Sequence, residues 1–256
     1  MSYLTIEALE VGYGEVSIID GLNLQLAQGK ITALIGPNGC GKSTLLKTIA
    51  RIIEPRAGRV CLQQQNVHEM DSRALARQMA LLPQAPVTPE GVSVRELVGY
   101  GRAPWISRWG QLSEADHQIV TEALTETHLL SLADSPVTDL SGGQRQRAWI
   151  AMILAQQTEL VLLDEPTTWL DIAHQVELLT LLRKLNEVGK TVVVVLHDLN
   201  QACRYCDDLV VLRDGQLQAH GRPEAVFTQD LIHNVFDLSA QIDVDPVSGT
   251  PICVPL

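Results

Sequence analysis

A phosphate-binding loop is the feature of this chain that most constrains its fold. The stretch Gly36–Thr44, GPNGCGKST, fits the pattern G-x-x-x-x-G-K-[ST]. It follows the apolar run Ile31–Ile35 and precedes the helical pattern Thr44–Ile53, and a phosphate-binding loop needs this strand–loop–helix order. Glycines let the backbone aim its N–H groups at phosphate oxygens, and the following helix adds the positive end of its dipole. Lys42 is then expected to reach the β- and γ-phosphates of a nucleotide, and Ser43 to bind Mg²⁺.

A second glycine-containing helix start lies far downstream. The stretch Leu140–Gln144, LSGGQ, opens a helical pattern that runs to about Gln157. Ser141 is a favourable N-cap residue, and the two glycines permit close approach of an anion to a helix N-terminus. One nucleotide needs only one such helix start. The second is therefore expected to serve a nucleotide that is held mainly by another copy of the chain.

Two adjacent carboxylates follow a buried strand. The run Leu160–Leu163 is continuously apolar, which is typical of a central parallel strand covered on both faces. Asp164 and Glu165 come directly after it, at the end of the strand where ligands of open α/β sheets collect. Taken alone, two acids at this place would fit a solvated turn equally well, so their meaning depends on the phosphate-binding loop.

Together these segments resemble the ATP-binding cassette (ABC) ATPases. Gly36–Thr44 resembles the Walker A motif, Leu140–Gln144 is identical to the signature motif, and Leu160–Glu165 resembles the Walker B motif followed by the catalytic glutamate. The resemblance covers nearly the whole chain. It implies a P-loop NTPase fold and a head-to-tail homodimer with two ATP molecules at the interface, each between one copy's phosphate loop and the other copy's signature.

The resemblance also implies roles for single residues. Asp164 would hold Mg²⁺, and Glu165 would orient and deprotonate the water that attacks the γ-phosphate. Gln84, after the apolar stretch that ends at Pro83, matches the glutamine that reaches Mg²⁺ and this water. His197 matches the switch histidine that contacts the γ-phosphate and holds Glu165 in position.

Two further matches have simple structural alternatives. Asp171 matches the residue that touches the opposite copy, and it is also a suitable N-cap for the helix that follows. Tyr13 matches the aromatic residue that stacks on adenine, although ordinary strand packing would also explain it. The expected catalytic residues are Glu165, His197 and Gln84; the metal-binding residues are Ser43, Gln84 and Asp164; and the nucleotide-binding residues are Tyr13, Gly36, Pro37, Asn38, Gly39, Cys40, Gly41, Lys42, Ser43, Thr44, Ser141, Gly142, Gly143, Gln144 and Asp171.

The remaining pattern predicts an α/β fold with an antiparallel β subdomain and an inserted helical subdomain. Alternation over Leu4–Leu26 predicts antiparallel strands, whereas Thr191–Leu196 is a second continuous apolar run. Helical periodicity places the helical subdomain at about 87–157. We expect a single domain over 1–236 and an extended tail over 237–256.

Composition narrows the classes of partner. The net charge is −11, and an acidic protein binds nucleic acid or anionic lipid poorly. No apolar run approaches the roughly eighteen residues of a membrane span, and the mixed N-terminus does not resemble a signal peptide. If the protein works at a membrane, it therefore docks from the cytoplasm on an integral partner. The resemblance to ABC ATPases implies that this partner is a permease and that the protein is peripheral, at the cytoplasmic face of the inner (cell) membrane.

Cysteine and tryptophan residues leave two questions open. Cys203 and Cys206 form a C-x-x-C pattern, but they fall in a helical run without a second pair, which favours packing over redox or metal chemistry. Trp105 and Trp109 lie in a loop-like stretch, where they would either anchor an interface or pack beneath the helices.

Within the ABC ATPases, the chain is most similar to stand-alone importer subunits for ferric siderophores, ferric citrate and vitamin B12, with the ferric citrate importers nearest. This similarity lies in Ile31–Thr44, in Leu81–Gln84 followed by Thr88–Gly91, in Val98–Arg102 and in Leu196–Asn200. It implies a permease and, indirectly, a substrate-binding protein as partners. The alternatives are a B12 or other importer, a soluble ABC ATPase in DNA or translation regulation, and a phosphotransferase, which would leave the signature unexplained.

Overall fold

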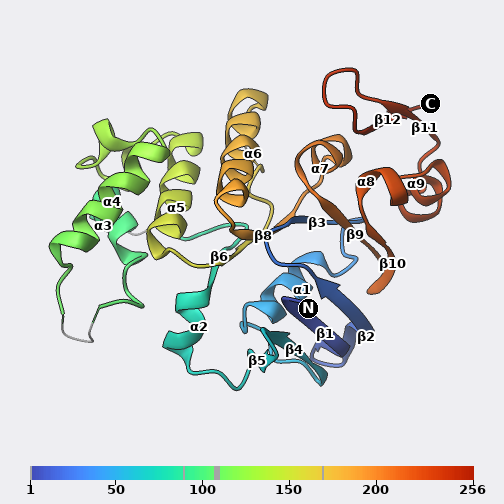
Figure 1. The fold of residues 1–256 in the computed structure, drawn as a ribbon, viewed down its shortest axis with the longest axis horizontal. Helices are drawn as coiled ribbons and strands as arrows, with labels where there is room; N and C mark the ends of the chain where they lie inside the picture. Colours follow the sequence, from blue (N-terminus) through green and yellow to red (C-terminus); the bar gives the residue numbers. More distant parts are fainter. Residues whose placement is uncertain (1, 89, 107–109, 169) are drawn as a thin grey trace.

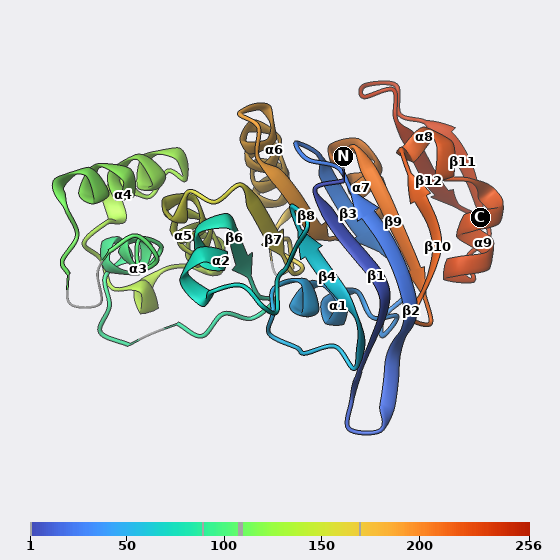
Figure 2. The same ribbon diagram turned by 60° about the horizontal axis from the view of Figure 1, so that its bottom comes forward.

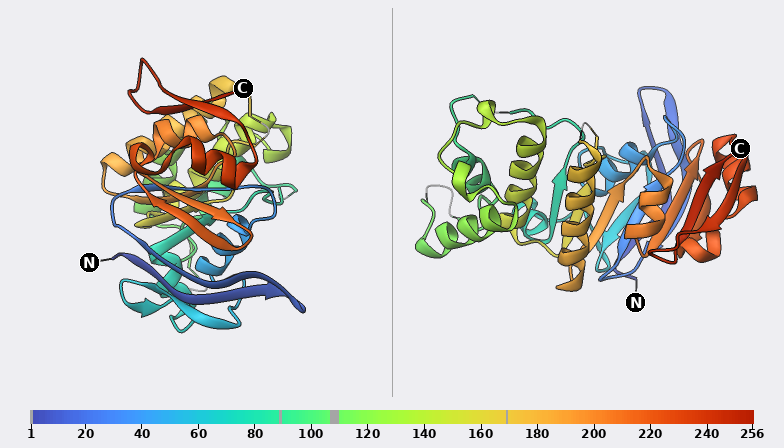
Figure 3. Two further views of the ribbon diagram at one scale, coloured as in Figure 1. Left: turned by 90° about the vertical axis from the view of Figure 1, so that its right-hand side faces the viewer. Right: turned by 90° about the horizontal axis from the view of Figure 1, so that it is seen from above.

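The computed structural model describes residues 2–88, 90–106, 110–168 and 170–256. Trp109 lies outside these ranges, as does Pro89 within the stretch Thr88–Gly91. The described residues form a central sheet with helices on one face, an antiparallel sheet on the other, and a group of helices at one end (Figure 1). The C-terminal hairpin lies at the opposite end, as the right-hand view of Figure 3 shows. Within the described ranges, no helix combines the length and the apolar character needed to cross a membrane.

The central sheet has six strands in the order β10-β9-β3-β8-β7-β6. Every pair in it is parallel except β10 with β9, so most carboxyl ends of the strands meet at one edge. All residues of β3, β7 and β8 are buried, as expected for short apolar strands that are covered on both faces. The strands are β3 (Ile31–Ile35), β6 (Met79–Leu82), β7 (Leu160–Leu163), β8 (Thr191–Val195), β9 (Asp208–Arg213) and β10 (Gln216–Gly221).

The two faces of this sheet belong to two different hydrophobic cores. Alternate residues of β3 make the division: Ala33 belongs to the core shared with helices α5, α6, α7 and α9, and Leu34 to the core shared with α1 and the antiparallel sheet. The antiparallel sheet has the order β2-β1-β4-β5 and covers α1 (Figure 2). These elements are β1 (Leu4–Tyr13), β2 (Val16–Leu26), β4 (Ala57–Leu62), β5 (Gln65–Asn66), α1 (Lys42–Ile49), α5 (Gly142–Gln156), α6 (Ile172–Glu187), α7 (Leu199–Tyr205) and α9 (Gln229–Phe236).

The helical portion has a core of its own. Leu97, Val120, Leu124 and Ala151 are fully or almost fully buried there. Helix α5 also presents Ile153 to the central sheet, so this helix joins the two cores. Three helices of the helical portion begin with a serine capping box, which satisfies backbone N–H groups that lack a partner within the helix. The segment contains α3 (Val94–Tyr100), α4 (Glu114–Glu126), two short 3-10 turns (Leu130–Leu132 and Val137–Asp139) and α5, and it follows α2 (Ser72–Gln78) and β6.

The C-terminal segment folds as a hairpin, where the sequence predicts only an extended tail. Strands β11 (Ala240–Val244) and β12 (Pro251–Pro255) pair in antiparallel fashion after the short helix α8 (Pro223–Val226) and α9. The turn between them closes through hydrogen bonds to Asp245, which are local contacts that hydrophobic periodicity does not report.

Candidate functional site: a nucleotide site at the carboxyl edge of the central sheet

The phosphate loop is folded around the side chain of Lys42. Gly36, Gly39 and Gly41 adopt positive φ angles of 149°, 79° and 102°, which glycine tolerates. The Lys42 Nζ donates to the carbonyl oxygens of Gly36 at 2.8 Å and Pro37 at 2.9 Å. Lys42 is only 5% exposed, and within the described residues it pairs with no carboxylate. Its third partner is the Cys40 sulfur at 3.8 Å, and a buried ammonium group bound only to neutral groups fits a loop that receives an anion.

Asp164 lies beside this loop, and only one of its two carboxylate oxygens takes part in a hydrogen bond. The Ser43 hydroxyl donates to Asp164 Oδ1 at 2.7 Å, whereas Oδ2 is buried and has no hydrogen-bond partner. Burial raises the pKa of this carboxyl group, against the Ser43 hydrogen bond, which lowers it. An unpaired buried carboxylate oxygen is costly, and together with a hydroxyl it forms a donor set that a hard divalent cation prefers. Ser43 and Asp164 therefore fit Mg²⁺.

Glu165 is bound from three sides. Its Oε2 accepts from Gln84 Nε2 at 2.6 Å and from Thr168 Oγ1 at 3.3 Å, and its Oε1 lies 2.7 Å from His197 Nε2. Gln84, Glu165 and His197 follow β6, β7 and β8, which are neighbours in the sheet, so the parallel topology brings them together. Glu165 has φ 52°, a left-handed conformation that is rare outside glycine and that clusters at functional sites. Thr168 had no signal in the sequence that would single it out.

The signature segment lies apart from the phosphate loop of the same chain. Ser141 caps α5, and its hydroxyl and N–H exchange bonds with Gln144. Within the described residues, no hydrogen bond joins 140–144 to 36–44. Helix α5 packs with the helical portion, whereas α1 lies under the central sheet (Figure 1). One copy therefore does not bring the two helix starts together.

Asp171 and Tyr13 occupy exposed positions. Asp171 is the N-cap of α6 and accepts from the backbone N–H of His174 at 2.9 Å, so the capping alternative is present in the structure. Its role toward a second copy stays a prediction. Tyr13 ends β1 opposite Val16 and is 51% exposed, so its ring is available to a ligand.

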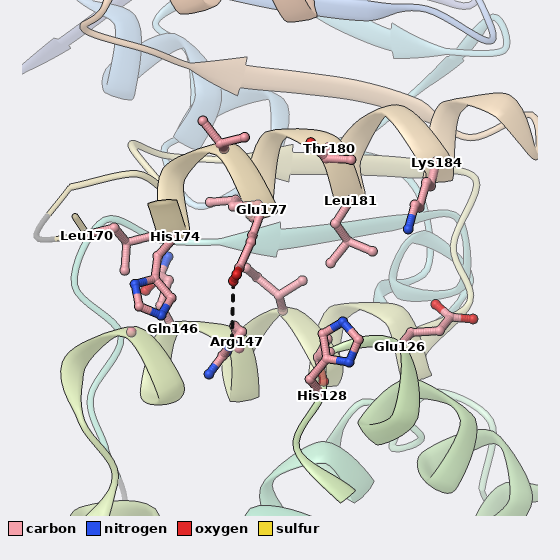
Figure 4. A pocket seen from close by; sticks show the side chains of 15 residues that line it. Glu126, His128, Gln146, Arg147, Leu170, His174, Glu177, Thr180, Leu181 and Lys184 are labelled. Carbon is pink, nitrogen blue, oxygen red and sulfur yellow. Dashed lines mark hydrogen bonds and ion pairs between the residues drawn. The ribbon is translucent and has the colours of Figure 1, made fainter. Parts of the chain in front are cut away.

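A cleft of about 260 Å³ separates α5 from α6 (Figure 4). Arg147 and Glu177 face each other across it at 3.4 Å. At its end, the ring of His174 lies 3.6 Å from where a side chain on Gly143 would begin. His174 also donates its backbone N–H to Asp171, so Gly143 of the signature and the N-cap of α6 lie on one surface of the molecule.

The open questions about tryptophan and cysteine have structural answers within the described residues. Trp105 donates to the Gln156 carbonyl at 2.8 Å, and its ring centroid lies 5.1 Å from the Arg77 guanidinium and 5.3 Å from that of Arg102. This residue therefore packs between α2 and the end of α5. All five cysteines are buried as free thiols, and burial raises the pKa of Cys203 to about 12.

Several known proteins are similar to this chain. Residues 19–168 match the family model described as ABC transporter. A probable siderophore transport system ATP-binding protein of Bacillus subtilis is 51% identical, over 100% of this chain and 93% of its own length. The ferric enterobactin transport ATP-binding protein of Escherichia coli is 49% identical, over 98% and 93%. A bacterial ABC transporter cassette solved as a dimer matches with a TM-score of 0.76 and 29% identity, over 86% of this chain and 98% of its own.

Proposed function

The chain belongs to the ABC transporter family, and from this premise we propose that it is the ATP-hydrolysing subunit of an importer for a ferric siderophore or a similar iron chelate. Relatives that are about half identical along nearly the whole chain are ATP-binding proteins of siderophore and ferric enterobactin transport. The observation that carries the hydrolysis is the Glu165 carboxylate, which is held by Gln84, Thr168 and His197 beside a phosphate loop.

Different residues of this chain have different roles in hydrolysis. Lys42 leaves the carbonyls of Gly36 and Pro37 to bind the β- and γ-phosphates, because a charged acceptor makes the stronger hydrogen bond. Ser43 and Asp164 would hold Mg²⁺, which neutralises charge on the phosphates when bound. Glu165 accepts a proton from the attacking water, and His197 and Gln84 keep its carboxylate in place.

A second copy completes each site. Ser141 and Gly143 lie away from the phosphate loop of their own chain, while a helix N-terminus with free N–H groups attracts phosphate. A head-to-tail dimer puts this helix start on the γ-phosphate held by the other copy. In this dimer Asp171 touches the opposite copy and Tyr13 stacks on adenine. The solved relative that is a dimer supports the association of two copies.

The membrane partner is a permease that the helical portion contacts from the cytoplasmic side. Gln84 joins the central sheet to this portion and also binds Glu165, so a change at the γ-phosphate reaches the docking surface through one residue. The cargo is chosen by the permease and a substrate-binding protein, and this chain does not touch it.

Uptake of labelled iron tests the proposal. Deleting the gene should abolish uptake of one ferric chelate and leave other iron routes working. The wild-type gene should restore that uptake, and a gene carrying Glu165→Gln should not. If uptake of ferric citrate, ferric hydroxamates and ferric catecholates all persists while vitamin B12 uptake fails, the cargo is wrong but the ABC importer assignment survives.

A further inference from the structure

The loop between Glu165 and Asp171 is held through its carbonyl oxygens. Gln146 of α5 donates to the carbonyl of Pro166 at 3.0 Å. Gln175 of α6 donates to the carbonyls of Leu170 at 2.9 Å and Thr167 at 3.4 Å. A carbonyl oxygen only accepts hydrogen bonds, so each of these contacts requires an N–H donor on the helix.

A third glutamine fixes the direction of these bonds. Gln201 of α7 donates its Nε2 to Gln175 Oε1 at 2.7 Å. The Oε1 of Gln201 itself is buried and has no hydrogen-bond partner. Leaving a buried acceptor unpaired costs free energy, but turning the Gln201 amide over would place its oxygen against Gln175 Oε1, and two acceptors form no hydrogen bond. The orientation of Gln201 is therefore set by what Gln175 needs in order to keep its own N–H groups on the loop.

These hydrogen bonds and the contact between His197 and Glu165 link both ends of the loop to α7, so that they form a ring of contacts around it. Helix α7 begins just after His197, whose Nε2 lies 2.7 Å from Glu165 Oε1. The same helix reaches the loop again through Gln201 and Gln175. A left-handed glutamate persists only where its surroundings over-determine its conformation, and this ring supplies such surroundings.

We propose that Gln175 is a positioning residue for ATP hydrolysis. It holds the carbonyl groups of Thr167 and Leu170 so that Glu165 keeps its left-handed conformation and Asp171 keeps its place at the start of α6, and Gln201 fixes its amide. The inference rests on the proposed ATPase function. A shift of the loop moves the carboxylate relative to the water it deprotonates, so loss of Gln175 lowers turnover more than it weakens nucleotide binding.

Replacing Gln175 by glutamate tests this directly, because the size is kept and the donor is lost. Gln175→Glu and Gln175→Ala should each lower kcat about tenfold or more, with KM for MgATP changed less than about threefold. Melting temperatures should stay within several degrees of the wild type. Within the described residues the Gln118 side chain of α4 bonds only to the exposed Glu122, so Gln118→Glu is the matched control and should leave kcat and KM unchanged.

Two double variants separate positioning from a general loss of structure. Gln201→Ala should lower kcat by itself and add nothing in the Gln175→Ala background, since Gln201 acts through Gln175. Gln175→Ala should in turn have no further effect on the residual rate of Glu165→Gln.

Some results would overturn this inference, and a different result would contradict the proposed function. Wild-type kcat in Gln175→Glu, or a fall in kcat that comes with an equal loss of nucleotide affinity and of melting temperature, would overturn the inference. Independent effects of Gln175→Ala and Gln201→Ala would also overturn it. Absence of ATP hydrolysis by the wild-type chain together with its permease would instead contradict the proposed function.

Discussion

At the residue scale, Glu165→Gln should keep nucleotide affinity and lose about two to four orders of magnitude in kcat, because the amide cannot accept the proton. Lys42→Ala should instead weaken nucleotide binding, since the loop loses its cation. Steady-state hydrolysis and equilibrium nucleotide binding, measured on the same preparations, separate the two effects. Hydrolysis by Glu165→Gln at nearly the wild-type rate would show that another group activates the water.

The surroundings of Glu165 could be predicted only in part, because some of its contacts form between residues that carry no motif. The phosphate loop, Asp164, Gln84 and His197 are predictable, because each follows a strand with a strong apolar pattern and matches a short motif. Thr168 and Gln175 are not, since a loop threonine and a helical glutamine are common and acquire meaning only when the sheet brings the loop and two helices together.

The buried ion pair between Arg102 and Asp116 should make the stability of the protein depend on pH. The Ser113 hydroxyl and then the Arg102 guanidinium, whose Nε lies 2.8 Å from Asp116 Oδ1, lower the pKa of Asp116 from 3.8 to about 2. Because this pKa is lower in the folded state, the pair stabilises the protein fully above pH 3.8 and less as the pH falls toward about 2.

Asp116→Asn should therefore reduce the free energy of unfolding at neutral pH by about 1–3 kcal/mol, because Arg102 is left buried without its counterion. The difference from the wild type should narrow as the pH falls through the acidic range. Urea unfolding at a series of pH values measures this difference, and one that does not vary with pH would mean that the carboxylate charge contributes nothing.

At the scale of elements, the continuous apolar strands were the most predictable and the C-terminal hairpin the least. Strands β3, β7 and β8 are predicted because burial on both faces demands apolar residues throughout. The hairpin is held by particular polar contacts instead: Asn200 on α7 exchanges two hydrogen bonds with the backbone of Cys253, and Arg204 pairs with Asp245. Such contacts leave no periodic signal in the sequence.

Two glycines in α3 and at its end offer a matched test of how closely it packs on α5. A Cβ on Gly101 would collide with the carbonyl oxygen of Met152 on α5, whereas one on Gly99 would meet only the flexible Leu112 side chain at 3.3 Å. Gly101→Ala should lower the free energy of unfolding by about 1–3 kcal/mol, and Gly99→Ala should change it by less than about 1 kcal/mol. Equal effects in denaturant unfolding would disprove the close approach of α3 and α5.

At the scale of the whole molecule, the docking surface can be located with single cysteines. All five native cysteines are buried, so a new exposed thiol should react selectively. Tyr100 lies in the helical portion and is 53% exposed, while Val188 at the end of α6 is 74% exposed and serves as the control. Tyr100→Cys should crosslink to a cytoplasmic loop of the permease and Val188→Cys should not. The reverse pattern would reject the helical portion as the docking surface.

The central claim is that ATP is hydrolysed at a site completed by a second copy, and mixed dimers test it most directly. Lys42→Ala and Ser141→Ala chains should each be nearly inactive alone, because each lacks one half of both sites. Heterodimers contain one intact site, so equal mixing should restore about a quarter of the wild-type rate if the copies associate at random and the sites act independently. A mixture no more active than its two components, measured where heterodimers are shown to form, would contradict the shared site.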